Sequence, residues 1–325
     1  MRLSAVLAAT LVTVAVAAAG TAGAGSRAVR RHAPLAAAPS SAPAVSRQRP
    51  LYGVTLDRIR GLPGVLAGLR TLPYRPTVRV YFDVREPASY YERAVTRIAK
   101  VGAVMGDLLD SSDERSISVA GMRARARSYV HLLGRHVTIW EVGNEVNGSW
   151  TGSHRAVAQK LVAAYAAVKA AGAKTALTLY ANDFGPDHCG DGRAELTPLQ
   201  FSRRWVPASL AHWLDYVLLS YYPTECGGRE PSAETVAVHL KRLRGVFPNA
   251  ALGFGEVGLT HAARRATWAR AARIMLWAYS LHPGPRCYVG GYFWWYAAED
   301  ALRRGAALAR ALRSAFGDEA RALGG

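Results

Sequence analysis

The sequence predicts a single α/β domain with the architecture of a (β/α)8 TIM barrel, and three observations lead to this fold class. After residue 50, short apolar runs alternate with longer segments in which apolar residues recur at helical spacing. The apolar runs are nearly continuous, which is typical of parallel strands that are buried on both faces. Eight such strand–helix units fit within residues 51–322, an ordinary length for this barrel.

The individual elements follow from these two patterns in chain order. The apolar runs predict strands at Leu51–Leu56, Thr77–Phe82, Val101–Gly106, His136–Val142, Lys174–Tyr180, Asp215–Tyr221, Ala250–Gly255 and Gly290–Trp295. The helical pattern predicts helices at Ala88–Ala99, Arg115–Leu133, Ser153–Ala171, Ala233–Val246, Ala262–Leu281 and Ala297–Ala322. The first crossover, Ile59–Leu69, has the weakest helical pattern because glycines and a proline interrupt it.

A doubly wound open sheet is the competing architecture for alternating strands and helices. Nucleotide-binding sheets of that kind carry a glycine-rich turn after the first strand. Here the first expected strand runs into Leu56 and Asp57 without such a turn. The barrel is therefore the favoured architecture.

The first 49 residues predict an export signal followed by a disordered leader. Arg2 supplies a positive start, Leu3–Ala19 carries no charge, and Ala22–Ala24 forms a small-residue cleavage site. A retained membrane anchor is less favoured because this stretch is mostly Ala, Thr and Gly, which partition weakly into hydrocarbon. We therefore expect a secreted protein cleaved near Ala24. The expected organisation is a signal peptide at 1–24, an Ala/Pro/Ser/Arg-rich leader at 25–49 and one folded domain at 50–325.

The formal net charge of +18 raises the question of an anionic partner. Only five of the 41 basic residues are lysines, and the arginines are scattered over the expected helices. No basic segment interleaved with aromatic residues, of the kind that stacks single-stranded nucleic acid, is visible. We expect no nucleic-acid partner and a monomer, while association with anionic cell-wall polymers stays open.

The three cysteines that remain after export are Cys189, Cys226 and Cys287. Two cysteines tend to pair in an oxidising compartment, and Cys189 and Cys226 lie in consecutive strand-to-helix loops. A bridge between these two is the favoured pairing, with Cys287 left over. Metal-ligand spacings and glycine-rich phosphate loops are absent from the sequence, so we expect neither a metal nor an organic cofactor.

Two expected strands lead directly into glutamates. The run Trp140–Glu145 closes with Asn144 and Glu145, and Glu256 follows the run Ala250–Gly255. A barrel gathers the carboxyl-terminal ends of its strands on one face, where the reactive residues of such enzymes lie. Two facing carboxyl groups are what retaining glycoside hydrolysis requires, one as proton donor and one as nucleophile. Their environments must separate their pKa values.

The run Trp140–Glu145, Trp-Glu-Val-Gly-Asn-Glu, resembles the Trp-Glu-Ile-Trp-Asn-Glu string of glycoside hydrolase clan A, a large group of retaining barrel enzymes. This resemblance implies that Glu145 is the acid/base, that Asn144 contacts the sugar 2-hydroxyl and that Glu256 is the nucleophile. Gly143 replaces an aromatic residue of the clan's string, and we expect this departure to open the barrel interior. The resemblance covers residues 50–322 as architecture and resolves no family within the clan.

Three further positions match the clan's pattern. The resemblance implies that Arg79 on the second strand keeps the nucleophile ionised and oriented. It implies a tyrosine hydroxyl on the nucleophile, for which Tyr222 is preferred to Tyr221. It also implies an aromatic floor for the sugar from Trp294 or Trp295, since an aromatic face packs against the apolar side of a pyranose.

Structural roles compete with several of these assignments. Glu141 shares the inward parity of Glu145, and we expect it to pair with a charged or hydroxyl group inside the barrel, with Arg79 as a candidate. Trp150 is an equal candidate for a sugar platform and for packing. Four polar residues just past strand ends either cap the following helices, which is slightly favoured, or contact sugar: Asp57, Asp107, Asp110 and Asn182.

The sequence therefore predicts an exported retaining glycoside hydrolase that acts on a β-linked glycan. Hydrolysis within the chain of a polysaccharide is the preferred form. The alternative is a catalytically silent carbohydrate-binding or cell-wall-associated barrel.

Overall fold

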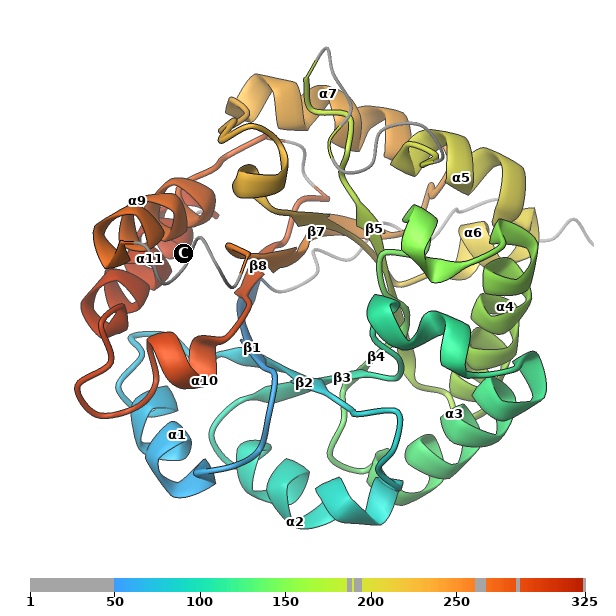
Figure 1. Ribbon diagram of the computed structural model, residues 1–325, viewed down its shortest axis with the longest axis horizontal. Helices are drawn as coiled ribbons and strands as arrows, with labels where there is room; N and C mark the ends of the chain where they lie inside the picture. The colour runs from blue at the N-terminus through green and yellow to red at the C-terminus, as the bar shows by residue number, and fades with distance from the viewer. Residues whose placement is uncertain (1–49, 186–188, 190–194, 261–266, 285–286, 324–325) are drawn as a thin grey trace, which may run out of the picture. The chain divides into compact units, whose positions relative to one another are not determined.

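The chain folds as the expected (β/α)8 barrel. The computed structural model describes residues 50–185, 189, 195–260, 267–284 and 287–323. Eight parallel strands close in sequence order, so that β1 lies beside β8 (Figure 1). The expected signal peptide at 1–24 and leader at 25–49 lie outside the described residues.

The strands agree with the expected ones to within three residues at each end. They are β1 Leu51–Leu56, β2 Thr77–Tyr81, β3 Ala103–Asp107, β4 Ile139–Gly143, β5 Lys174–Tyr180, β6 Tyr216–Tyr221, β7 Ala251–Val257 and β8 Gly290–Trp294. One difference concerns the site directly. β7 continues through Glu256 instead of ending before it, so the backbone of this residue is held in the sheet.

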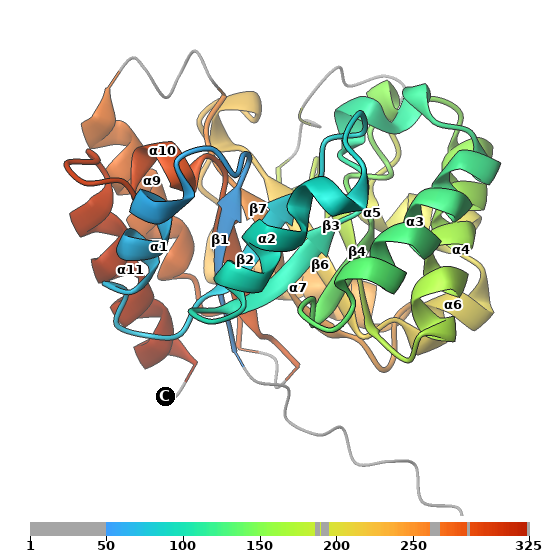
Figure 2. The ribbon, with the colours of Figure 1, turned by 90° about the horizontal axis from the view of Figure 1, so that it is seen from below.

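The helices surround the strands, as the side view shows (Figure 2). They are α1 Leu62–Leu69, α2 Ala88–Ile98, α3 Val119–Leu133, α4 His154–Ala170, α5 Pro198–Trp205, α6 Ala208–Trp213, α7 Ala233–Arg244, α9 Trp268–Tyr279, α10 Ala297–Asp300 and α11 Ala309–Ala322. In the part of the chain that the structure describes, three 3-10 segments follow strands: η1 Ser111–Ser116 after β3, η2 Ser149–Thr151 after β4 and η3 Pro223–Glu225 after β6. Within the described ranges, no helix combines the length and the apolar character needed to cross a membrane.

Two expected helices differ from the observed ones within the described residues, and the start of a third, expected at Ala262, lies outside them, with α9 beginning at Trp268. The helix expected from Arg115 begins at Val119, because the Ser118 side chain caps it by accepting a hydrogen bond from the Gly121 amide. The final helix is interrupted between α10 and α11. The weak first crossover does form α1, and its interrupting Gly68 has a packing reason, since a Cβ there would lie 1.9 Å from the Leu302 carbonyl oxygen.

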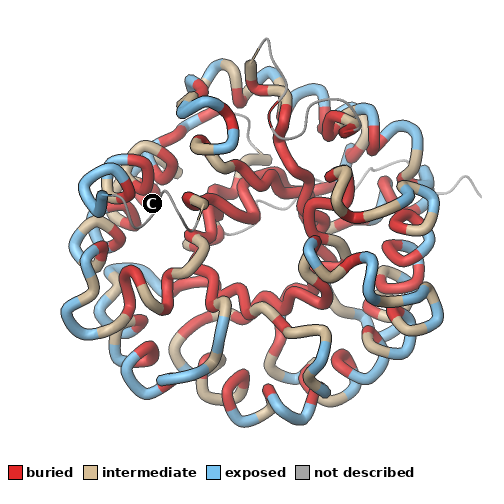
Figure 3. The backbone as a smooth tube through the Cα atoms, viewed as in Figure 1, coloured by how far each residue is buried: buried red, intermediate tan, exposed pale blue. Residues whose placement is uncertain are grey.

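The core has two parts. The larger part lies between the strands and the inner faces of the helices, where buried positions line both layers (Figure 3). A smaller apolar cluster fills the barrel interior, with Met105, Ile139 and Leu218 among its members. Polar side chains, Arg79 and Glu141 among them, are also fully buried. The interior is therefore a packed core that includes a polar network.

The expectation that Gly143 opens the barrel interior is wrong. The register between β4 and β5 shifts at this point, so that Glu141 pairs with Ala176 but Gly143 pairs with Leu177. A Cβ on Gly143 would lie 3.3 Å from Leu161 of α4 and 2.7 Å from Val146. The position faces the layer between strands and helices, where a larger side chain would have to displace its neighbours.

The disulfide favoured from the sequence is present. Cys189 and Cys226 are bonded, and the bridge joins the segment after β5 to the end of η3. Both segments border the carboxyl-terminal ends of the strands. Cys287 is free and partly buried.

We expect the double substitution Cys189→Ser/Cys226→Ser to lower the free energy of unfolding. The bridge spans 37 residues of sequence, and constraining a loop of that length in the unfolded chain contributes on the order of 4 kcal/mol. Chemical denaturation of the oxidised protein measures the change. The matched control is Cys287→Ser, which removes a thiol without opening a loop and should leave the midpoint nearly unchanged. Equal midpoints for all three proteins would contradict this role of the bridge.

Candidate active site

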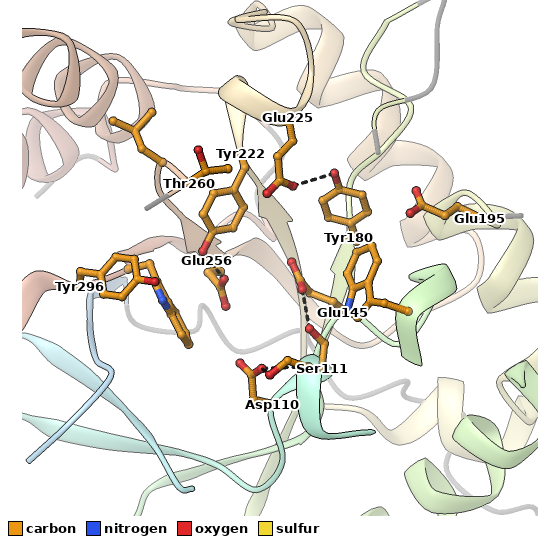
Figure 4. Close-up of a pocket in the computed structure, with 14 residues that line it drawn as sticks. Asp110, Ser111, Glu145, Tyr180, Glu195, Tyr222, Glu225, Glu256, Thr260 and Tyr296 are labelled. Carbon is orange, nitrogen blue, oxygen red and sulfur yellow. Dashed lines mark hydrogen bonds between the residues drawn. The ribbon is translucent and has the colours of Figure 1, made fainter. Parts of the chain in front are cut away.

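A cavity of about 740 Å³ opens at the carboxyl-terminal ends of the strands. Both glutamates singled out from the sequence line it (Figure 4). The lining combines carboxylates, hydroxyls and aromatic rings: Asp110, Ser111, Ser112, Glu145, Trp150, Tyr180, Glu195, Tyr222, Glu225, Glu256, Leu259, Thr260, Trp295 and Tyr296. Closing the barrel has therefore brought the ends of β4 and β7 to one site.

Glu145 lies two residues beyond β4, on a backbone that few side chains adopt. Its φ angle is +45°, in the left-handed region, and its carbonyl oxygen accepts a hydrogen bond from the Gly148 amide. A non-glycine residue in this conformation costs free energy, and such strain tends to be kept where it orients a functional group. Here it turns the carboxyl group into the cavity (Figure 4).

The Glu145 carboxyl group is held by hydroxyls. Ser111 donates a hydrogen bond to Oε2 at 2.7 Å, and Ser220 donates one to Oε1 at 2.5 Å. Burial raises the pKa of Glu145 to about 7, although both serine hydrogen bonds act in the opposite direction. Glu145 is thus able to hold a proton near neutral pH and to release it, which suits an acid that later serves as a base.

Glu256 has different partners. Arg79 Nη1 lies 3.0 Å from Glu256 Oε2, the Tyr222 hydroxyl donates to Oε1, and the Asn144 amide donates to Oε2 at 3.4 Å. Burial raises the pKa of Glu256, and the positive charge of Arg79 opposes that rise. The net effect leaves the pKa of Glu256 well above its ordinary value, so Glu256 differs from Glu145 in its donors: a cation and two neutral groups, each of which favours the ionised form.

Asn144 connects the surroundings of the two glutamates. Its Oδ1 accepts a hydrogen bond from the Ser111 amide at 3.0 Å, while its amide group faces Glu256. The same Ser111 donates its hydroxyl to Glu145. The η1 segment therefore positions both the acid and the asparagine.

Arg79 lies fully buried on β2 and contacts three carboxyl groups. Its Nε lies 2.6 Å from Glu141 Oε2, its Nη2 lies 3.1 Å from Asp107 Oδ2, and its Nη1 faces Glu256. The expected pairing of Glu141 with Arg79 is present, and Thr178 adds a hydroxyl to Glu141. Asp107, for which helix capping was slightly favoured, lies in β3 and pairs with the guanidinium.

The structure separates the aromatic pairs. Tyr222 lines the cavity, whereas Tyr221 is buried and donates its hydroxyl to the Arg229 carbonyl. Trp295 lines the cavity with its ring 5.1 Å from the Arg79 guanidinium carbon. Of the two candidates for the aromatic floor, Trp295 lines the cavity and Trp294 does not. Trp294 is fully buried, and its indole N–H donates to Asp300 at 3.3 Å.

Of the other candidate residues, two line the cavity and two do not. Trp150 lines the cavity and makes an edge contact with Tyr180, with ring centroids 5.1 Å apart. Asp110 caps η1 by accepting from the Ser112 amide, and it lines the cavity as well. Two others lie outside the lining: Asp57, which pairs with Arg58, and Asn182, which donates to Glu195.

Sequence reasoning missed several residues of the site. Ser220 could have been found, since it shares strand parity with Tyr222 two residues later. Ser111 could not, because it reaches Glu145 from a 3-10 segment that has no periodic signal. Glu225 and Tyr180 were also missed; the Tyr180 hydroxyl donates to Glu225 Oε2 at 3.0 Å. Among the residues that the structure describes, no group of three His, Cys, Asp or Glu is arranged to hold a metal ion.

Comparisons with known proteins support the fold. Neither a protein-family model nor a curated protein matches the chain. Solved structures do: a GH5-4 broad-specificity endoglucanase from an uncultured bacterium has a TM-score of 0.53 at 12% identity, covering 78% of this chain and 84% of that one. A GH10 xylanase from Bispora sp. MEY-1 has a TM-score of 0.52 at 13% identity, covering 81% and 95%.

A family 1 β-glucosidase from Thermotoga maritima is similar to the same degree, with a TM-score of 0.50 at 12% identity over 73% of this chain and 76% of that one. At such identities the likeness shows the fold alone. The (β/α)8 barrel expected from the resemblance to clan A is confirmed, and three families of glycoside hydrolases share it with this chain. No single family is resolved.

Proposed function

We propose that the protein is an exported retaining glycoside hydrolase that acts on a β-linked glycan. The observation that carries this proposal is the contrast between two glutamates in one cavity. Glu145 receives only hydroxyl donors, and burial raises its pKa to about 7. Glu256 receives a guanidinium and a tyrosine hydroxyl. Opposed environments of this kind separate a proton donor from a nucleophile.

The proposed reaction is a double displacement. Glu256 attacks the anomeric carbon while Glu145 gives its proton to the departing glycosidic oxygen, and a glycosyl ester forms on Glu256. Glu145, now ionised, takes a proton from water, and the resulting hydroxide attacks the anomeric carbon. The ester bond breaks, the sugar is released with its original anomeric configuration, and Glu145 is protonated again.

The arrangement of the cavity supports binding within a glycan chain. The leaving group must lie on the side of Glu145, where Tyr180 and Glu195 are found (Figure 4). Trp150 contacts Tyr180 on that side, and Trp295 contacts Tyr296 on the side of Glu256. Aromatic rings on both sides of the reacting pair offer faces for sugars before and after the cleaved bond.

Other observations support parts of the proposal. The similar solved structures are named as a xylanase, an endoglucanase and a β-glucosidase, which favours a β-linked substrate. The Cys189–Cys226 bridge favours an oxidising compartment and hence export. The open cavity beside Glu145 and Glu256 favours hydrolysis over the catalytically silent alternative, which would leave these groups without a use.

Glu256→Gln should abolish hydrolysis without unfolding the protein. Loss of the nucleophile prevents ester formation, so kcat should fall by about four to six orders of magnitude. The measurement uses a panel of β-linked glycans, including glucans, mannans, xylans and galactans, on which the wild-type protein is first shown to be active. Glu92→Gln, a change of a partly exposed residue on α2, is the matched control and should keep full activity. Retained activity in Glu256→Gln would show that Glu256 is not the nucleophile.

Glu145→Ala should respond to a good leaving group and to azide. An aryl glycoside with an activated leaving group needs no proton, so its first step should survive, and azide should replace water in the second step. The expected result is faster turnover and a glycosyl azide product. Glu225→Ala is the matched control, because it removes a second carboxylate of the same cavity. If azide accelerates neither variant, Glu145 has another role.

The pH dependence of hydrolysis should change when a serine hydrogen bond to Glu145 is removed. Glu145 must be protonated for the first step, so the rate should fall as pH rises through about 7. Ser220→Ala removes a donor that stabilises the ionised form, so the pKa should rise and the basic limb should move to higher pH by about one unit. Ser112→Ala is the control, since that hydroxyl bonds Asp110. An unmoved basic limb in Ser220→Ala would contradict this link.

A further inference from the structure

Inside the barrel, a single cation faces three acidic side chains. The Arg79 guanidinium lies 2.6 Å from Glu141, 3.0 Å from Glu256 and 3.1 Å from Asp107. Arg79, Asp107 and Glu141 are fully buried, and Glu256 is 4% exposed. Across the described ranges, no second cation is paired with any of the three acids. If all three were ionised, the four groups would carry two net negative charges.

Such an excess of buried charge is expensive. Carboxylates that share one buried site cannot all ionise, because each loses its hydration and repels the others. A buried acid commonly responds by keeping its proton. The interior should therefore hold at least one proton at neutral pH, and the hydrogen bonds indicate which acid keeps it.

The acid with the weakest donors is the one that stays protonated. Glu256 forms an ion pair with Arg79 Nη1 at 3.0 Å and accepts hydrogen bonds from Tyr222 and Asn144, and its proposed chemistry requires it to be ionised. Glu141 has the shortest contact with Arg79 and also receives the Thr178 hydroxyl. Asp107 has the longest contact with Arg79 and, besides it, only the Leu109 amide at 3.2 Å.

We propose that Asp107 holds a proton at neutral pH and serves as an uncharged positioning residue for Arg79. The guanidinium charge is then shared between Glu141 and Glu256 alone. The charged groups that act on Asp107 are Arg79 from β2, Glu141 from β4 and Asp110, which follows its own strand. Burial raises the pKa of Asp107, Arg79 opposes the rise, and Glu141 and Asp110 add to it.

A neutral Asp107 has a consequence for the reaction, which rests on the proposed function of Glu256. The network carries one negative charge while Glu256 is free, and it becomes neutral when the glycosyl ester forms. If Asp107 were ionised, the network would carry two negative charges while Glu256 is free and one negative charge in the ester. The neutral acid therefore lets Glu256 stay ionised without placing a third negative charge in the interior.

Carbon-13 NMR of the whole protein with labelled aspartate side chains tests the proposal directly. Asp107→Asn, which resembles the neutral acid in shape, identifies the Asp107 carboxyl signal by its loss. We expect that signal at the chemical shift of a protonated acid at pH 7, with titration only at higher pH. A signal at the carboxylate position at pH 7 would overturn the proposal. This result does not depend on any enzymatic activity, so it is separable from failure of the proposed function.

The pH profile of kcat/KM is a second measurement, and a purely structural role of Asp107 would not change it. If Asp107 is neutral, Asp107→Asn should leave the acid limb of kcat/KM in place. If Asp107 is ionised, the substitution removes a negative charge near Glu256, and the acid limb should move to lower pH, which would overturn the proposal. Glu141→Gln is the contrasting variant: it removes an ionised partner of Arg79 and should shift that limb downward.

Infrared spectroscopy of the wild-type protein needs no variant and keeps the proposal testable if Asp107→Asn does not fold. A carbonyl band of a protonated carboxyl group should be present at pH 7 and should shift when aspartate carries carbon-13. The absence of any such aspartic acid band would overturn the proposal.

Discussion

The buried guanidinium of Arg79 is the interaction on which the site depends. It joins four strands of the barrel, since its partners Asp107, Glu141 and Glu256 belong to β3, β4 and β7. Removing one partner of a buried ion pair typically costs about 3–5 kcal/mol, because the other charge stays buried without compensation. Here a single change would leave three acids without their cation. The position of Glu256 and the packing of the interior are therefore coupled.

The fold gives the two proposed reacting groups, Glu145 and Glu256, different positions and different partners. Arg79 reaches Glu256 from inside the barrel, whereas Glu145 stands on a strained turn and meets only the hydroxyls of Ser111 and Ser220. Asn144 lies between them and is fixed by η1. Two residues of the same type thereby have different donors, hydroxyls at Glu145 and a guanidinium at Glu256, as an acid and a nucleophile in one cavity require.

Irregularities in the strands direct the side chains of the site. Leu219 of β6 pairs with Phe254, but Ser220 pairs with Glu256, so the register shifts by one residue at Gly255. A Cβ on Gly255 would lie 2.5 Å from the Thr178 hydroxyl, which itself binds Glu141. Shifts of this kind re-aim side chains next to functional sites. Simple alternation along a strand does not predict them, which is why Gly143 faces the helix layer instead of the barrel interior.

The order of strands and helices, the barrel, the favoured disulfide pairing and the positions of Glu145, Glu256, Arg79 and Tyr222 could all be predicted from the sequence. The elements follow from periodicity and the cysteine pairing from the loops that carry the cysteines. The site positions follow from the residues at strand ends together with the resemblance to clan A. Three features come from the folded barrel instead: Trp295 and not Trp294 faces the cavity, Ser111 reaches Glu145, and Asp107 pairs with Arg79. The physical reason is that each of these depends on the register and closure of strands distant in the chain, which bring three acids to one buried charge.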